Sequence, residues 1–135
     1  MANIAASVAL EPFCCENHNE GNMMENKTVL ITGGNKGIGL SATEKFIDAG
    51  YTVIVVARNF NNFKFKGHSR VTTIEFDLVN VAGIPRLVAQ LPAVDILINN
   101  AGVMYALPYD NYPQGKVDEL LKINIEAPVA LIREV

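Results

Sequence analysis

The stretch TGGNKGIG, residues 32–39, separates a short apolar run from an amphipathic segment. Four of the chain's ten glycines fall within these eight residues. Glycine is required where the backbone turns sharply and where main-chain N–H groups must approach a phosphate without an intervening side chain. A helix that begins after such a turn directs the positive end of its dipole at the phosphate. The stretch therefore predicts a nucleotide-phosphate site, in which Lys36 is either a further phosphate contact or an exposed loop residue.

Strand-like and helix-like segments alternate along the chain around this turn. The predicted strands are 28–32, 51–57, 71–76 and 95–98, and the predicted helices are 37–49, 81–91 and 113–135. Strands that read as continuous apolar runs are buried on both faces, as in a parallel sheet. With right-handed crossovers, this alternation predicts a doubly wound α/β sheet. The expected apolar face of the first helix consists of Ile38, Ala42, Phe46 and Ile47.

Composition narrows the class of protein. The 135 residues are 50% apolar and 19% charged, which excludes disorder throughout, and no apolar run is long enough to span a membrane. The adjacent pair Cys14 and Cys15 supports neither a disulfide framework nor a zinc site, and it is most simply incidental. Residues 1–26 hold four acidic residues and no basic one, so the net charge of −3 leaves the remainder near neutral. We expect a disordered acidic tail or a mis-assigned start, no nucleic-acid partner, and a default location in the cytoplasm.

Four strings in order resemble the short-chain dehydrogenases/reductases. The first is the glycine turn; the others are Asp77-Leu78, Asn99-Asn100-Ala101-Gly102, and Asn124 in the last predicted helix. The resemblance covers residues 27–135 and implies a Rossmann-like sheet of order 3-2-1-4. It further implies that the cofactor is contacted by Gly33, Gly34, Asn35, Lys36, Gly37, Ile38, Gly39, Arg58, Asp77, Leu78, Asn99, Asn100, Ala101 and Gly102. It implies no metal site.

Two of these assignments have structural alternatives. Asp77 either reaches the adenine amino group or caps the loop that follows its strand. Asn99 and Asn100 either contact the cofactor, stabilise the sheet by satisfying backbone groups at the strand end, or do both. Ala101 and Gly102 have the small bulk that a cofactor lying over the strand end requires.

The end of the second predicted strand indicates which nicotinamide cofactor is preferred. An NAD site commonly places an acid there, to hold the ribose 2′-hydroxyl group. This chain has Arg58 instead, followed by Lys64, Lys66 and Arg70 with no acid between. A guanidinium group can stack on adenine and pair with a 2′-phosphate. We therefore predict NADP(H) rather than NAD(H), the alternative being that Arg58 is an ordinary surface residue.

The last predicted helix combines an asparagine with a proline. Its expected apolar stripe consists of Val117, Leu120, Leu121, Asn124, Pro128, Leu131 and Val135. Pro128 has no N–H to give to the carbonyl of Asn124, four residues earlier, so that carbonyl needs another partner. In the resembling family, this asparagine helps hold a water molecule in a proton relay. We predict that role for Asn124, with a helix-packing amide as the alternative.

The family's serine, tyrosine and lysine, which act in hydride transfer to a carbonyl or from an alcohol carbon, lie beyond this asparagine and are absent here. Tyr112 and Lys116 fit the tyrosine–lysine spacing but precede Asn124 at the start of a helix, so we reject them as that pair. We expect a truncated NADP(H)-dependent oxidoreductase domain for a small-molecule substrate, inactive alone, its full-length form a homo-oligomer. The alternatives are a non-catalytic dinucleotide-binding module or pseudogene product and, less consistent with Arg58, a methyltransferase.

Overall fold

A computed structural model describes residues 27–135, together with all their side chains except that of Tyr109. The acidic tail expected over residues 1–26, including Cys14 and Cys15, lies outside the described residues. The boundary between that tail and the folded domain therefore stays a prediction.

Four parallel strands form the sheet. They are β1 (Thr28–Thr32), β2 (Thr52–Ala57), β3 (Val71–Glu75) and β4 (Ile96–Ile98). Their order is β3-β2-β1-β4, which confirms the predicted doubly wound arrangement. Leu30 of β1 lies level with Ile54 of β2 on one side and with Leu97 of β4 on the other. Within the described residues, β4 pairs with β1 alone and therefore forms one edge of the sheet.

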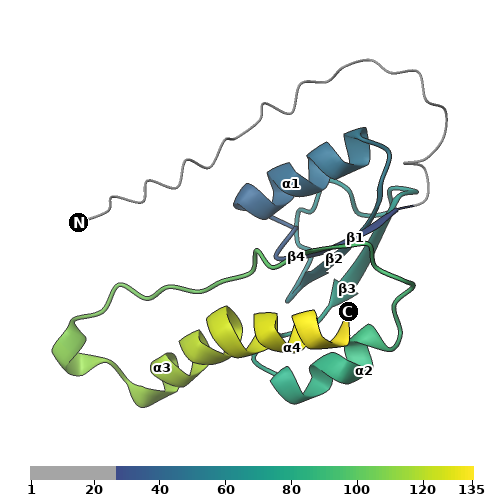
Figure 1. The fold of residues 1–135 in the computed structure, drawn as a ribbon. Coiled ribbons are helices and arrows are strands. Elements are labelled where there is room, and N and C mark those ends of the chain that lie inside the picture. The colour runs from purple at the N-terminus through teal and green to yellow at the C-terminus, as the bar shows by residue number, and fades with distance from the viewer. Residues whose placement is uncertain (1–26) are drawn as a thin grey trace, which may run out of the picture.

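Helices cover both faces of the sheet. Figure 1 shows helix α1 (Gly37–Asp48) on one face and helices α2 (Ile84–Val88) and α4 (Ala127–Glu134) together on the other. A short 3₁₀ helix, Val81–Gly83, leads into α2, so the predicted 81–91 helix is shorter than expected. None of the described helices is long and apolar enough to cross a membrane.

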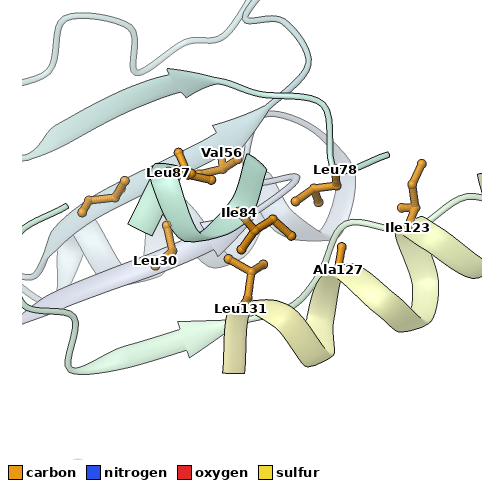
Figure 2. Close-up of a cluster of buried hydrophobic side chains, with 9 residues drawn as sticks. Leu30, Val56, Leu78, Ile84, Leu87, Ile123, Ala127 and Leu131 are labelled. Atoms are coloured by element: carbon orange, nitrogen blue, oxygen red, sulfur yellow. The ribbon is translucent and has the colours of Figure 1, made fainter. Parts of the chain in front are cut away.

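The core under α2 and α4 fixes the position of the last helix. Leu30 of β1 and Val56 of β2 are buried there, and Figure 2 shows the side chains that meet them. These are supplied by the loop after β3, by α2 and by the last helix: Leu78, Ile84, Leu87, Ile123, Ala127 and Leu131. Burying a side chain of leucine or isoleucine size contributes about 1.5–3 kcal/mol.

The opposite face of the sheet is covered differently. Residues 58–70 join β2 to β3 without a helix, and the rings of Phe60 and Phe63 are buried against the strands, 5.5 Å apart at their centroids. Phe46 of α1 packs on the same cluster. Ile38 does not, being 85% exposed, so its place on the predicted apolar face of α1 was wrong. It stands in the first turn of α1, at the carboxyl ends of the strands.

The predicted 113–135 helix is interrupted. It consists of α3 (Gln114–Leu121), a π-helical segment (Lys122–Glu126) and α4. At the end of the π-helical segment, the Ala127 N–H donates to the carbonyl of Lys122, five residues earlier. Pro128, which cannot donate to Asn124, lies directly after this wider turn. The extra residue changes which side chains face the sheet.

Candidate functional site

The glycine turn brings the backbone of α1 close to the end of β1. Gly37 has φ +55°, in the left-handed region that favours glycine, and it begins the helix. Gly39 lies so close to the carbonyl of Gly33 and the side-chain amide of Asn100 that a Cβ atom would collide with both. No side chain caps the N-terminus of α1, and its first turn holds no acidic residue. Its N–H groups are therefore suited to an external anion.

A set of hydrogen bonds joins this turn to the end of β4. The Asn100 side-chain amide donates to the carbonyls of Thr32 at 3.0 Å and Gly33 at 3.2 Å. In return, the buried Thr32 hydroxyl oxygen accepts from the backbone N–H groups of Asn100 at 3.1 Å and Ala101 at 3.0 Å. Sequence reasoning placed Asn100 here but missed Thr32. Its only signal was a hydroxyl on the last residue of a buried strand.

A cleft of about 370 Å³ opens between the glycine turn, the end of β2 and the end of β4. Its walls are formed by Gly33, Lys36, Gly37, Ile38, Gly39, Arg58, Asn100, Ala101, Gly102 and Ile123. All of these except Ile123 are among the cofactor contacts that the sequence predicts. The cleft thus gathers residues that lie far apart in the chain, at the carboxyl ends of the strands, where ligands bind in open α/β sheets.

Gly34 and Asn35, the two other predicted contacts in the glycine turn, do not line this cleft. Thr43, buried in α1, donates from its hydroxyl group to the carbonyl of Gly34 at 3.0 Å. Asn35 donates from its amide to the carbonyl of Asn59 at 2.8 Å, which links the glycine turn to the segment after β2. These two hydrogen bonds hold Gly34 and Asn35 in place within the turn.

Three predicted contacts that follow β3 and β4 also lie outside the cleft. Asp77 accepts the N–H of Val79 at 3.1 Å, the loop-capping alternative, and its side chain is exposed. Leu78 is buried in the core beneath α2. Asn99 is exposed beside Asn100. None of these three lines the 370 Å³ cleft.

Asn124 contacts the backbone on the other side of the sheet end. Its Oδ1 accepts the N–H of Val103 at 2.9 Å, and its Nδ2 donates to the carbonyl of Val103 at 2.8 Å. Asn124 is exposed, as are Leu121 and Val135, so their expected places on an apolar stripe were wrong. Leu131 of that stripe is buried, and beyond the π-helical turn it packs on the core with Ile123 and Ala127. The amide is thus engaged with one residue of the loop, and the relay role of Asn124 stays a prediction.

Tyr112 and Lys116 do not form a pair with each other. The Tyr112 hydroxyl group donates to the carbonyl of Tyr105 at 2.6 Å. The Lys116 ammonium group pairs with Glu119 at 2.9 Å and lies 4.4 Å from the centre of the Tyr105 ring. Hydrogen bonding to Glu119 raises the pKa of Tyr105, which makes that phenol a weaker acid.

The cations of the cleft are Lys36 and Arg58. The other basic residues predicted to add to this field are engaged or lie elsewhere: Lys64 pairs with Glu44 at 2.5 Å, and Arg70 donates to the carbonyl of Gly50 at 2.5 Å. Among the described residues, no cluster of three or more histidine, cysteine or acidic side chains could hold a metal ion. The cleft can therefore bind an anion through backbone N–H groups and through the two cationic side chains of Lys36 and Arg58.

Comparison with known proteins agrees with this arrangement. The family model of the short chain dehydrogenases matches residues 27–135. The chain belongs to the short-chain dehydrogenase family. A short-chain dehydrogenase/reductase of Pestalotiopsis microspora is 29% identical over 106 residues, covering 78% of this chain and 40% of the relative. A 3-oxoacyl-[acyl-carrier-protein] reductase of rhamnolipid biosynthesis in Pseudomonas aeruginosa is 26% identical over 120 residues, covering 82% of this chain and 47% of the relative.

Solved structures of the family superpose on the same part. A 4-hydroxyisoleucine dehydrogenase complexed with NADH gives a TM-score of 0.75 at 31% identity, covering 81% of this chain and 47% of that one. The RhlG/NADP complex of Pseudomonas aeruginosa gives 0.69 at 26% identity, covering 80% and 46%. This chain therefore spans about half the length of the relatives that it matches.

Proposed function

We propose that this chain supplies the dinucleotide-binding half of an oxidoreductase that transfers hydride between a nicotinamide cofactor and a carbonyl or alcohol carbon of a small molecule. The observation that carries the proposal is the cleft, in which the uncapped N-terminus of α1 and two cations face the ends of β2 and β4. When bound, the nicotinamide group would donate or accept the hydride.

The residues of the cleft fit a dinucleotide. Nothing lies within 4 Å of the position that a Cβ atom on Gly37 would occupy, so a pyrophosphate can reach the N–H groups of the turn there. Thr32 and Asn100 fix the two strand ends that form the floor. Ile38 is exposed at the rim and offers an apolar surface to a planar ring. Relatives with NADH and with NADP bound superpose on this part of the chain.

The proposed preference is for NADP(H). Arg58 lines the cleft directly after the last residue of β2, where no carboxylate is present. A planar guanidinium group in that position would favour a 2′-phosphate over a 2′-hydroxyl group. Titration followed by cofactor fluorescence should therefore give tighter binding of NADPH than of NADH.

Charge reversal tests this preference. Arg58→Asp should weaken NADPH binding by tenfold or more, because a charge-assisted hydrogen bond contributes about 1.5–3 kcal/mol, and it should reverse the order of the two cofactors. Lys66→Asp is the matched control, since Lys66 is exposed in the same basic segment but does not line the cleft. Equal binding of both cofactors by the unaltered chain, or an equal effect of the control, would refute the preference.

We further propose that these 135 residues bind the cofactor without turnover. Tyr112 and Lys116 have other partners, and the pKa of Tyr105 is raised by Glu119, so none of these groups is arranged as an activated proton donor. The 135-residue chain should bind NADPH but leave its absorbance unchanged in the presence of carbonyl substrates. Measurable NADPH oxidation would contradict this. Homo-oligomerisation of the complete protein and a location in the cytoplasm stay predictions.

A further inference from the structure

Residues 103–121, the loop after β4 together with α3, form an arm. None of its described side chains is buried, and Figure 1 shows it running out beyond the end of the sheet. By contrast, α4 packs on the sheet and on α2 through Ala127 and Leu131. Val103 packs against the hydrophobic core at the start of the arm, but residues 104–121 do not, and their order depends on their own contacts and on the two connections to the body.

Contacts inside the arm tie its loop to its helix. Tyr112 bonds to the backbone of Tyr105, whose ring lies beneath the ammonium group of Lys116. Lys116 in turn pairs with Glu119. A cation over an aromatic ring is attracted by the negative face of the ring. These contacts join the loop to α3.

The two connections of the arm meet beside the candidate cofactor cleft. Gly102 and Ile123 both line the cleft, and each directly precedes one partner of the pair formed by Val103 and Asn124. The Asn124 amide joins that pair through two hydrogen bonds, at 2.9 and 2.8 Å. We call this pair of bonds the clamp. A ligand that touches Gly102 or Ile123 acts one residue away from it.

The π-helical segment Lys122–Glu126 provides a place at which the arm can pivot. It separates α3 from the packed helix α4, and Pro128 prevents the ordinary α-helical bond to the Asn124 carbonyl. Because the helix is already interrupted here, a change in the direction of α3 need not disturb Ala127 or Leu131.

From this placement we infer that the arm is coupled to the cleft through the clamp, so that a dinucleotide in the cleft orders residues 104–121. The inference rests on the proposed function, since it requires a cofactor in the cleft. Ligand binding that stabilises one end of a weakly held element reduces local opening of the rest. Asn124 acts here as a positioning residue, through its side chain.

Hydrogen exchange of the 135-residue chain, with and without saturating NADPH, tests the coupling. Backbone amides of residues 104–121 should exchange several-fold more slowly with NADPH. In Asn124→Ala the same amides should exchange faster than in the unaltered chain when NADPH is absent. Addition of NADPH should no longer slow their exchange. Gln114→Ala is the matched control, because it removes an exposed hydrogen bond to Asp118 on α3 and leaves the clamp intact. It should respond as the unaltered chain does.

NADPH fluorescence in the same samples separates the possible failures. Absence of NADPH binding to the unaltered chain would overturn both the proposed function and the coupling. Binding without slower exchange of residues 104–121 would overturn the coupling alone. A full response in Asn124→Ala would overturn the role of the clamp. If circular dichroism shows that this variant is unfolded, Asn124→Asp replaces it, because it keeps the acceptor for the Val103 N–H and loses the donor.

Discussion

Thr32 shows how one side chain can organise a site without lining it. Its hydroxyl oxygen, 1% exposed as a residue, accepts two backbone N–H groups from the segment after β4. It also lies 3.4 Å from the carbonyl of Ile98, to which it donates. Thr32, the last residue of β1 and the first of the glycine turn, therefore holds that turn at a fixed separation from the end of β4. The width of the cleft depends on this separation.

Replacement of Thr32 by valine keeps the shape of the side chain and removes these hydrogen bonds. Thr32→Val should lower the free energy of unfolding by about 1–3 kcal/mol, because a buried N–H group loses its acceptor. It should also weaken NADPH binding. Thr43→Val is the control: it removes a buried hydroxyl bonded to Gly34, so it should cost comparable stability while NADPH affinity is retained. Urea unfolding and fluorescence titration measure the two effects, and equal loss of affinity in both variants would contradict the assignment.

Among the elements, the arm carries the groups whose ionisation is perturbed. Hydrogen bonding to Tyr105, then to Lys116, lowers the pKa of Glu119. Hydrogen bonding to Glu119 is in turn the main cause of the raised pKa of Tyr105 and of the raised pKa of Lys116. The contribution of Glu119 to the stability of the fold is present above its ordinary pKa of about 4, and it is lost as the pH falls through the lowered pKa. The contributions of Tyr105 and Lys116 are present below pH about 10 and are lost as the pH rises through the raised values.

Glu119→Gln tests this arrangement directly. Since Glu119 is the main cause of the raised pKa of Tyr105, the variant should lower the pKa of Tyr105 towards the ordinary pKa of tyrosine. Spectrophotometric titration of tyrosinate measures the change. Asp118→Asn removes a neighbouring exposed carboxylate that does not contact Tyr105, and it should leave the titration as it was. A shift of the same size in both variants would count against a specific contact.

Over the whole molecule, one surface of the described residues is strongly apolar. It lies on the outward side of the last helix, where Leu121, Ile125, Val129 and Ile132 are 41–65% exposed, and β4 is paired on one side only. Clustered apolar side chains of this kind promote association. Of these four residues, only Leu121 had been expected on the inward stripe of the helix.

The 135-residue chain should therefore self-associate. Light scattering after size-exclusion chromatography should give a mass above 14.7 kDa that rises with protein concentration. The double variant Ile125→Lys with Val129→Lys should shift the chain to monomer, because both side chains are more than half exposed on this surface. Met104→Lys, at an 88% exposed position in the arm, should have no such effect. A monomeric unaltered chain throughout the micromolar range would refute the prediction.

The sequence predicted those features that depend on local pattern. The buried runs predicted a parallel, doubly wound sheet, the family resemblance implied its strand order, and the structure confirms both. A cleft opens beside the glycine turn of residues 32–39, while the ligand contacts predicted there stay a prediction. The sequence could not predict features that depend on residues distant in the chain. The exposure of Ile38 follows from the turn's geometry, and the phase of the last helix changes because Pro128 accompanies a π-helical turn. The partners of Thr32 lie more than sixty residues away.

The aromatic connection between β2 and β3 has a consequence for Arg58. The Ala57 carbonyl accepts the N–H of Phe76, the Asn59 carbonyl accepts the Asn35 amide, and the Phe60 ring is buried. The main chain around Arg58 is thus immobilised on both sides when the protein folds. In the proposed binding of a 2′-phosphate, only the side chain of Arg58 would have to become ordered, so the entropic penalty of binding would be smaller. Phe60→Ala should therefore reduce the proposed preference for NADPH over NADH, although the Phe60 ring is buried and does not line the cleft.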